Sequence, residues 1–221
     1  MPVTRKRREP RDPEWTRRSL LETGAQLFAE SGYEGVRVEA LARKAGVNKA
    51  MINYHFGGKR KLYETILVSV FSELAGRVRE LERSSRPPAD LLREFIDGVA
   101  DVARQTPGFT ALVLREVLST GRISPQLLPL KLKLLVGVRG IIERGIREGS
   151  FRKVDATVAY LNLIGGLAFF FATEPARRRV FATQRLGAPP SAESYVAYVQ
   201  ELMQVGLARA PRSKPSRGAS A

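Results

Sequence analysis

Hydrophobic residues recur at the spacing of an α-helix along nearly the whole of this chain. In the first such stretch, Leu20, Gly24, Leu27 and Phe28 fall on one face of a helix. No run shows the alternation of period two that is typical of a half-buried strand. The periodicity therefore predicts an all-α fold.

Residues that start or stop helices divide the chain at regular intervals. Ser31-Gly32 ends the first helix, and Gly57-Gly58 precedes a long one. Ser124-Pro125 is a start signal, because serine caps helices and proline is tolerated in the first turn. Asp155 is placed to cap an apolar helix. The predicted helices span about residues 14–30, 37–44, 48–54, 59–83, 90–105, 109–119, 124–148, 155–174 and 191–207.

The composition excludes several kinds of functional site. The chain has no cysteine, which excludes a zinc finger, a thiolate nucleophile and an iron–sulfur cluster. Its one histidine, His55, excludes a metal site built from several histidines. No glycine-rich phosphate loop and no pair of nucleophile and base is visible. We therefore expect no enzymatic activity, no cofactor and no bound metal.

An excess of basic residues indicates an anionic partner. The chain carries 37 Lys and Arg against 22 Asp and Glu, a formal net charge of +15. Net charge alone does not distinguish nucleic acid from an anionic membrane. We expect residues 1–13 to form a flexible basic arm and residues 209–221 a disordered basic tail. For both ends, solvated charge and contact with phosphate remain open.

One stretch is long enough to be tested for a membrane span. The 18 uncharged residues between Asp155 and Glu174 are at the lower limit for crossing a bilayer. Polar Thr157 and Asn162 and the Gly165-Gly166 pair interrupt it. A helix that is apolar nearly all round is more often a buried helix of a soluble protein. We expect a cytoplasmic protein with no membrane association.

Residues 38–57 have the spacing of a helix-turn-helix. Two short helices that cross steeply need a small residue at their contact and a turn residue that tolerates positive φ. Ala42 and Gly46 stand at these two positions. Asn48 can cap the second helix. The inward positions are filled by Leu41, Ala45, Val47 and Ile52.

Residues 14–74 resemble the TetR family of bacterial transcriptional regulators. The resemblance is carried by Leu27-Phe28 with Gly32-Tyr33, by the stretch ALARKAGVNKAMINYHF, and by Lys59 with Leu62. It implies an N-terminal three-helix DNA-binding domain over residues 14–74, with its helix-turn-helix at 37–56. It also implies a larger helical domain over residues 75–208, which binds an effector and dimerises.

The resemblance implies a set of DNA contacts. Lys49 and Ala50 would face base edges, while Tyr54 and Lys59 would contact the backbone. Asn53 replaces the usual tyrosine, and pairing with adenine or contact with phosphate both remain open for it. The full set is Arg37, Asn48, Lys49, Ala50, Met51, Asn53, Tyr54, His55 and Lys59.

Other roles are open for some side chains of this segment. Tyr54 could instead pack against the first helix, and Phe56 is more typical of a core residue. Glu39 would repel phosphate, so we expect it to point to solvent or to pair with Arg43 at i+4.

The resemblance also implies a homodimer whose last long helices pair with their copies, although ordinary monomer core explains the same residues. The expected dimer residues are Leu161, Gly165, Ala168, Phe169, Tyr198 and Leu202. An effector pocket would be lined by Phe95, Val99, Phe109, Leu112, Val113, Glu116, Leu134 and Val138. Core packing accounts for these pocket residues equally well.

Together these features predict a ligand-responsive, sequence-specific transcriptional regulator. We expect a repressor that binds a palindromic operator as a homodimer and is released by a small-molecule effector. The alternative is a basic architectural protein that binds DNA without regard to sequence.

Overall fold

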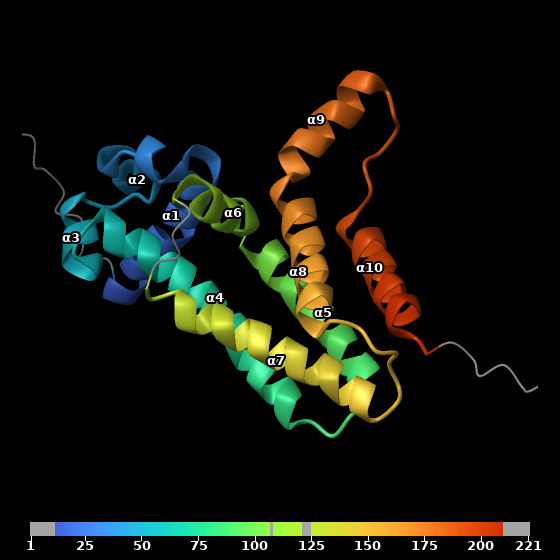
Figure 1. Ribbon diagram of the computed structural model, residues 1–221. Helices are drawn as coiled ribbons and strands as arrows, with labels where there is room; N and C mark the ends of the chain where they lie inside the picture. Colours follow the sequence, from blue (N-terminus) through green and yellow to red (C-terminus); the bar gives the residue numbers. More distant parts are fainter. Residues whose placement is uncertain (1–11, 107, 121–124, 210–221) are drawn as a thin grey trace, which may run out of the picture.

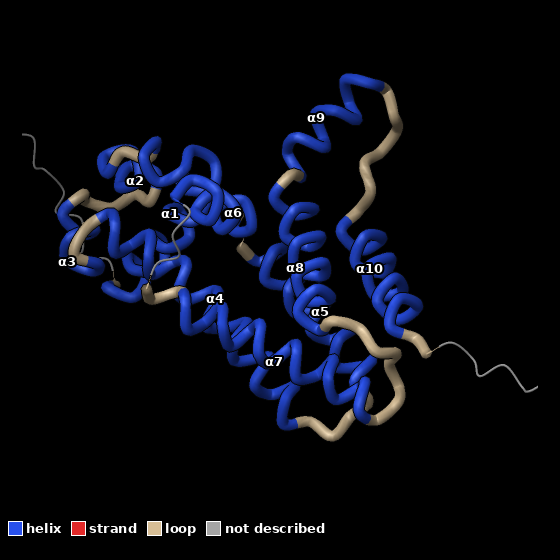
Figure 2. Tube along the Cα trace, viewed as in Figure 1, coloured by secondary structure: helices blue, strands red, loops and turns tan. Residues whose placement is uncertain are grey.

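The structure, a computed structural model, describes residues 12–106, 108–120 and 125–209 (Figure 1). The side chains of residues 116–120 also lie outside the described part. Within these ranges the regular structure is helical, as predicted (Figure 2). An isolated antiparallel bridge joins Phe151 to Ala208. The helices are α1 (Pro13–Gly35), α2 (Val38–Lys44), α3 (Ala50–Phe56), α4 (Lys59–Arg83), α5 (Pro88–Gln105), α6 (Phe109–Thr120), α7 (Leu128–Arg147), α8 (Ala156–Ala172), α9 (Glu174–Gln184) and α10 (Ala192–Leu207).

The first three helices form a small unit on the beginning of α4. Helix α1 packs on α2, α3 and α4, and Asp12 caps it by accepting a hydrogen bond from the amide of Glu14. The predicted stop at Ser31-Gly32 is a kink instead of an end. Gly32 has φ of 70°, and the helix resumes through Gly35. Such a backbone conformation costs glycine little, so a short last turn can form beyond it.

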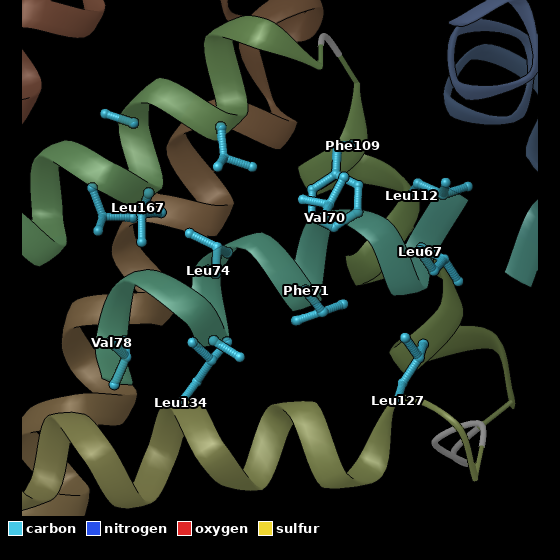
Figure 3. Packing of buried hydrophobic residues seen from close by; sticks show 14 of the residues in the cluster. Leu67, Val70, Phe71, Leu74, Val78, Phe109, Leu112, Leu127, Leu134 and Leu167 are labelled. Atoms are coloured by element: carbon cyan, nitrogen blue, oxygen red, sulfur yellow. The ribbon is translucent and has the colours of Figure 1, made fainter. Parts of the chain in front are cut away.

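Helix α4 connects the two parts of the molecule (Figure 1). It begins and ends at the predicted residues, Lys59 and Arg83, and packs on α1 and α3 at one end and on α5 and α7 further along. The domain boundary expected after residue 74 therefore falls inside a continuous helix. Its buried face meets Leu134 of α7, and the ring of Phe71 meets that of Phe109 of α6 edge-on, with centroids 5.7 Å apart (Figure 3). This single core spans both parts of the chain.

Helix α6 lies between the two parts, packing on α1 on one side and on α8 on the other. Helix α7 lies along α4, and α10 packs on α5 and α8. Helix α9 stands away from the rest of the molecule and has no buried residue (Figure 1). A cavity lies at the α8–α9 bend, beside the start of α6.

Most helix ends agree with the sequence prediction; besides the end of α1, three elements do not. The start predicted at Ser124 is wrong, because α7 begins at Leu128; Ser124 itself lies outside the described residues. The recognition helix, expected from residue 48, begins at Ala50. The sequence prediction has no helix over Glu174–Gln184, where α9 forms with Pro175 in its first turn.

Helix α8 is buried along one face and exposed along the other. Tyr160, Leu163 and Leu167 are buried, whereas Leu161 and Phe169 are exposed. The sequence of α8 is apolar nearly all round, but within one protomer only one of its faces is buried. No single helix of the described residues is long and apolar enough to cross a membrane; α8 and α9 pass that test only as a pair, and they are bent by 61°.

Candidate nucleic-acid interface

The helix-turn-helix has the geometry that its sequence predicts. Gly46 has φ of 67°, and the amide of Val47 donates a hydrogen bond of 3.0 Å to the carbonyl of Ala42. Leu41, Ala42, Ala45 and Ile52 are buried, and Val47 is half-buried. The Ser19 hydroxyl donates to the carbonyl of Ala45 at 3.0 Å, which fastens the turn to α1. The buried residues of the motif and this hydrogen bond to α1 together fix the orientation of α3.

The start of α3 is held by Asn48. Its side-chain oxygen accepts a hydrogen bond of 2.9 Å from the amide of Ala50, which satisfies one unpaired donor of the helix. The capping role predicted for Asn48 is confirmed. Lys49, Ala50 and Asn53 are exposed, and Met51 is half-buried. The first turn of α3 therefore presents side chains outward at the place where recognition helices read base edges.

Glu39 and Lys49 form an ion pair across the motif. Lys49 Nζ lies 3.5 Å from Glu39 Oε1, and both side chains are about two-thirds exposed. Of the two alternatives expected for Glu39, exposure is confirmed, and its charged partner is Lys49 instead of Arg43. The pKa of Glu39 is lowered by a hydrogen bond from a backbone amide and by the charge of Lys49, so Glu39 is ionised at neutral pH. The steep crossing of α2 and α3 brings these residues together, although they are ten positions apart.

Three consecutive aromatic residues end α3: Phe56 lies in the core, whereas Tyr54 and His55 reach the surface. Phe56 is buried, as predicted, and the guanidinium of Arg17 lies 5.5 Å from its ring centroid. Tyr54 is 76% exposed, so packing against the first helix does not explain it. His55 is half-buried, and its ring meets that of Tyr54 edge-on at 5.0 Å. A largely exposed tyrosine on the same short helix as Asn53 suits contact with a nucleic-acid backbone.

Lys59 is the first residue of α4, the helix that follows the recognition helix α3 along the chain. Its ammonium lies 4.2 Å from the ring centroid of Tyr33, a cation–π contact that holds the side chain near the helix N-terminus. Lys59 is half-buried, whereas Arg37 at the start of α2 is exposed. Both sit at helix starts, where free amides and the helix dipole favour a phosphate.

The residues expected at a dimer interface are mostly exposed. Leu161, Phe169, Tyr198 and Leu202 are each more than half exposed, on α8 and α10. Gly165 is exposed as well, and a Cβ there would have no neighbour within 4 Å. Ala168 is half-buried at the edge of this surface.

The residues expected to line an effector pocket belong to the packed core. Val113 is half-buried, and the side chain of Glu116 lies outside the described residues. The others are buried in the shared hydrophobic cluster: Phe95, Val99, Phe109, Leu112, Leu134 and Val138.

A cavity of about 530 Å³ lies instead at the α8–α9 bend. Ala103, Gly108, Phe171, Arg177 and Glu193 are among the residues that line it. The sequence prediction misses this cavity because it assigns no helix to 174–184. The Glu174-Pro175 pair, an acidic residue followed by proline, is a helix-start signal that could have revealed α9.

The sequence matches two family descriptions. Residues 20–66 match "Bacterial regulatory proteins, tetR family", and residues 88–203 match "Tetracyclin repressor-like, C-terminal domain". The first match covers the helix-turn-helix, and the second spans more than half of the chain.

Known proteins of similar length resemble the chain. It is 28% identical over 198 residues to the HTH-type transcriptional repressor NicS of Pseudomonas putida, covering 88% of this chain and 93% of that protein. It is 26% identical over 147 residues to the HTH-type transcriptional repressor KstR2 of Rhodococcus jostii, covering 65% and 72%. The structure of the TetR family transcriptional regulator PfmR from Thermus thermophilus superposes with a TM-score of 0.66 and 26% identity, covering 86% and 96%.

Proteins of this kind are transcription factors and not enzymes; they bind DNA operators and effectors, usually as dimers. The helix-turn-helix geometry, the helical second part and both family matches agree: the chain belongs to the TetR family of bacterial regulatory proteins.

Proposed function

We propose that this protein is a cytoplasmic repressor that binds a two-fold symmetric operator as a homodimer and leaves it when a small molecule binds. The outward face of α3 carries this proposal. Ile52 and Phe56 anchor the helix in the core, while Lys49, Asn53 and Tyr54 project from its other side. A helix anchored in the core in this way can present the same side chains to the major groove each time it binds.

The exposed apolar surface of α8 and α10 supports a homodimer. Soluble monomers rarely leave several large apolar side chains side by side in water. A second copy of the same surface would cover them, as a two-fold interface requires. One short recognition helix reads few base pairs, so two copies are needed for a specific site.

The net charge of +15 favours a second candidate, a basic protein that coats DNA without reading its sequence. The two candidates predict different dependences of DNA binding on salt and on sequence. Attraction to phosphates alone falls steeply with salt and does not discriminate among sequences. Contacts of α3 with base edges select particular bases at physiological salt.

A binding selection separates the two candidates. The purified full chain is incubated with random-sequence duplex DNA at near-physiological salt, and the bound DNA is sequenced. We expect a two-fold symmetric motif whose half-sites lie about one helical turn, roughly 34 Å, apart. Recovery of no motif, with binding that disappears as salt rises, would contradict the specific regulator and support the coating protein.

A further inference from the structure

The cavity at the α8–α9 bend has the size of a small-molecule site. Its volume of about 530 Å³ falls within the range of pockets that hold small organic ligands. The walls come from the end of α5, the start of α6, the α8–α9 bend and the segment that leads into α10. Because four separate segments meet here, a ligand in the cavity would contact all of them.

Three arginines line this cavity, and one of them differs from the others. Arg104 pairs with Asp101 at 2.6 Å, and Arg178 pairs with Glu174 at 2.7 Å. Arg177 has no such ion pair among the described residues. Its Nη1 donates to the carbonyl of Phe170 at 2.7 Å, while its Nε is buried without any hydrogen-bond acceptor. The charge of Arg177 thus has no carboxylate partner among the described residues, and an anion bound in the cavity would supply one.

The guanidinium of Arg177 is held in place by a stack of rings. Its central carbon lies 3.8 Å from the ring centroid of Phe170. Tyr195 of α10 stacks on the same ring at 3.8 Å and 4°. At these distances Arg177 and Tyr195 must occupy opposite faces of Phe170. The positive charge is therefore positioned before any ligand arrives, which lowers the entropic cost of binding.

We propose that this cavity is the effector site and that it takes a small organic monoanion, a carboxylate with an apolar body, whose charged group pairs with Arg177. This inference rests on the proposed function. Phe171 provides an apolar wall for the body of the ligand. Glu193 disfavours a second negative charge, because a hydrogen bond from a backbone amide keeps its pKa low and it stays ionised. A neutral molecule would leave the Arg177 guanidinium without a counter-ion.

The cavity borders the DNA-binding part directly. Gly108 lines the cavity, and a Cβ added to it would lie only 2.2 Å from the Cβ of Ala29 in α1. Helix α1 in turn holds the turn of the helix-turn-helix through the bond from Ser19 to Ala45. A ligand that moves the start of α6 would therefore displace α1 and shift the population away from the form that fits DNA.

Two fluorescent probes that differ by one anionic group test the site. The probes are 1-anilinonaphthalene-8-sulfonate and its uncharged counterpart N-phenyl-1-naphthylamine, each titrated into the full chain. We expect the anionic probe to bind at one saturable site per protomer. It should be displaced by 3-phenylpropionate and not by 3-phenylpropionamide, because only the carboxylate can pair with Arg177.

Variants separate the role of Arg177 from general effects of charge. Arg177→Gln should weaken binding of the anionic probe by about tenfold or more, since a charged hydrogen bond is lost. Binding of the uncharged probe should not change. Arg179→Gln, an equal change on an exposed residue of α9 that does not line the cavity, is the matched control and should leave both probes unaffected. Ala103→Met fills the cavity without altering charge and should weaken both probes.

Operator binding by the same samples distinguishes failure of this inference from failure of the proposed function. Arg177→Gln should bind the operator normally without ligand, and the anionic probe should weaken operator binding by the wild type but not by this variant. Equal probe affinities of the wild type, Arg177→Gln and Arg179→Gln would overturn the site while leaving the regulator intact. Probe binding through Arg177 with no effect on operator affinity would overturn its role as the effector site. A wild type that selects no operator would sink the proposed function itself.

Discussion

The ammonium of Lys49 lies 3.5 Å from the carboxylate of Glu39, so the basic residue nearest the expected base edges is paired within the protein before DNA is bound. Helix α2 contributes Glu39, and Lys49 stands at the start of α3. Binding of Lys49 to DNA would have to break or rearrange this pair. Glu39 therefore opposes binding twice, by holding Lys49 and by repelling phosphate.

Glu39→Gln should strengthen DNA binding. The change frees Lys49 and removes a negative charge from the DNA-facing side, so we expect about a threefold lower Kd at low salt and a smaller gain at high salt. Fluorescence anisotropy with a labelled operator measures both. Glu143→Gln on α7 makes the same charge change far from α3 and should leave the Kd unaltered. An equal gain in both variants would assign the effect to net charge alone.

Lys49→Ala and Asn53→Ala should relax sequence preference, whereas Lys59→Ala should weaken all DNA sequences to a similar degree. The first two side chains are exposed at α3, and Lys59 lies at the start of α4 beside Tyr33. Loss of a base contact costs about 1–3 kcal/mol at one position, and loss of a phosphate contact lowers the salt slope by about one. Repeating the binding selection with each variant measures the difference. Identical behaviour of all three would show that the assignment of base and phosphate contacts is wrong.

Gly46→Val should destabilise the helix-turn-helix. Gly46 has φ of 67°, a conformation that a β-branched residue adopts only with strain of about 1–3 kcal/mol. Gly76→Ala is the matched control, because Gly76 is inside α4 with no atom within 4 Å of an added Cβ. That change should stabilise the protein by about 0.5–1 kcal/mol. Urea unfolding measures the change in the free energy of unfolding of each variant. A Gly46→Val protein as stable as the wild type would contradict the turn geometry.

Phe169→Glu should dissociate the proposed dimer. Phe169 is 66% exposed on the apolar surface of α8 in one protomer. In the proposed dimer this position would be covered, and a carboxylate buried there would have no ion-pair partner. Val136→Glu on α7, where the valine is 59% exposed, is the control and should remain dimeric. Sedimentation equilibrium measures the mass. A dimeric Phe169→Glu protein would place the interface elsewhere.

Tyr160 should make the protein less stable at high pH. Burial raises the pKa of its hydroxyl above the ordinary value. As the pH rises, the tyrosine hydroxyl therefore loses its proton in the unfolded chain before it does so in the folded protein. The contribution of Tyr160 to the free energy of unfolding is complete below a pH of about 10 and is lost as the pH rises through the folded-state pKa. Tyr160→Phe should unfold less steeply with pH above that value than the wild type. The exposed Tyr198→Phe should follow the wild type in urea titrations, and a parallel loss in all three proteins would exclude this role for Tyr160.

Local signals in the sequence are enough to place most helices. Asp155 accepts hydrogen bonds from the amides of Thr157 and Val158, and Ser191 accepts one from the amide of Ser194. Capping depends on residues only two or three positions apart, so the sequence shows it directly. The same holds for Gly46, whose positive φ follows from its place in the turn.

Features that depend on contacts between distant residues are not predictable in this way. The partner of Glu39 is Lys49 and not Arg43, because the crossing of two helices outweighs the spacing within one. Helix α9 has no buried face and therefore no hydrophobic periodicity to reveal it. The cavity beside Arg177 is built from four separate segments, which only the folded chain brings together.

Because α4 is one continuous helix, a small tilt at its C-terminal end would become a larger displacement at its N-terminal end. Its 25 residues form a rod about 37 Å long, roughly the distance between two half-sites on DNA. If the rod tilts by about 5° around its far end, Lys59 and the recognition helix before it travel about 3 Å, close to one base-pair step. In a symmetric dimer both heads would move by that amount, and their spacing would no longer match consecutive turns of the double helix. If the protein leaves its operator in this way, no helix has to unfold, because a small tilt of a helix this long is enough to mismatch the two half-sites.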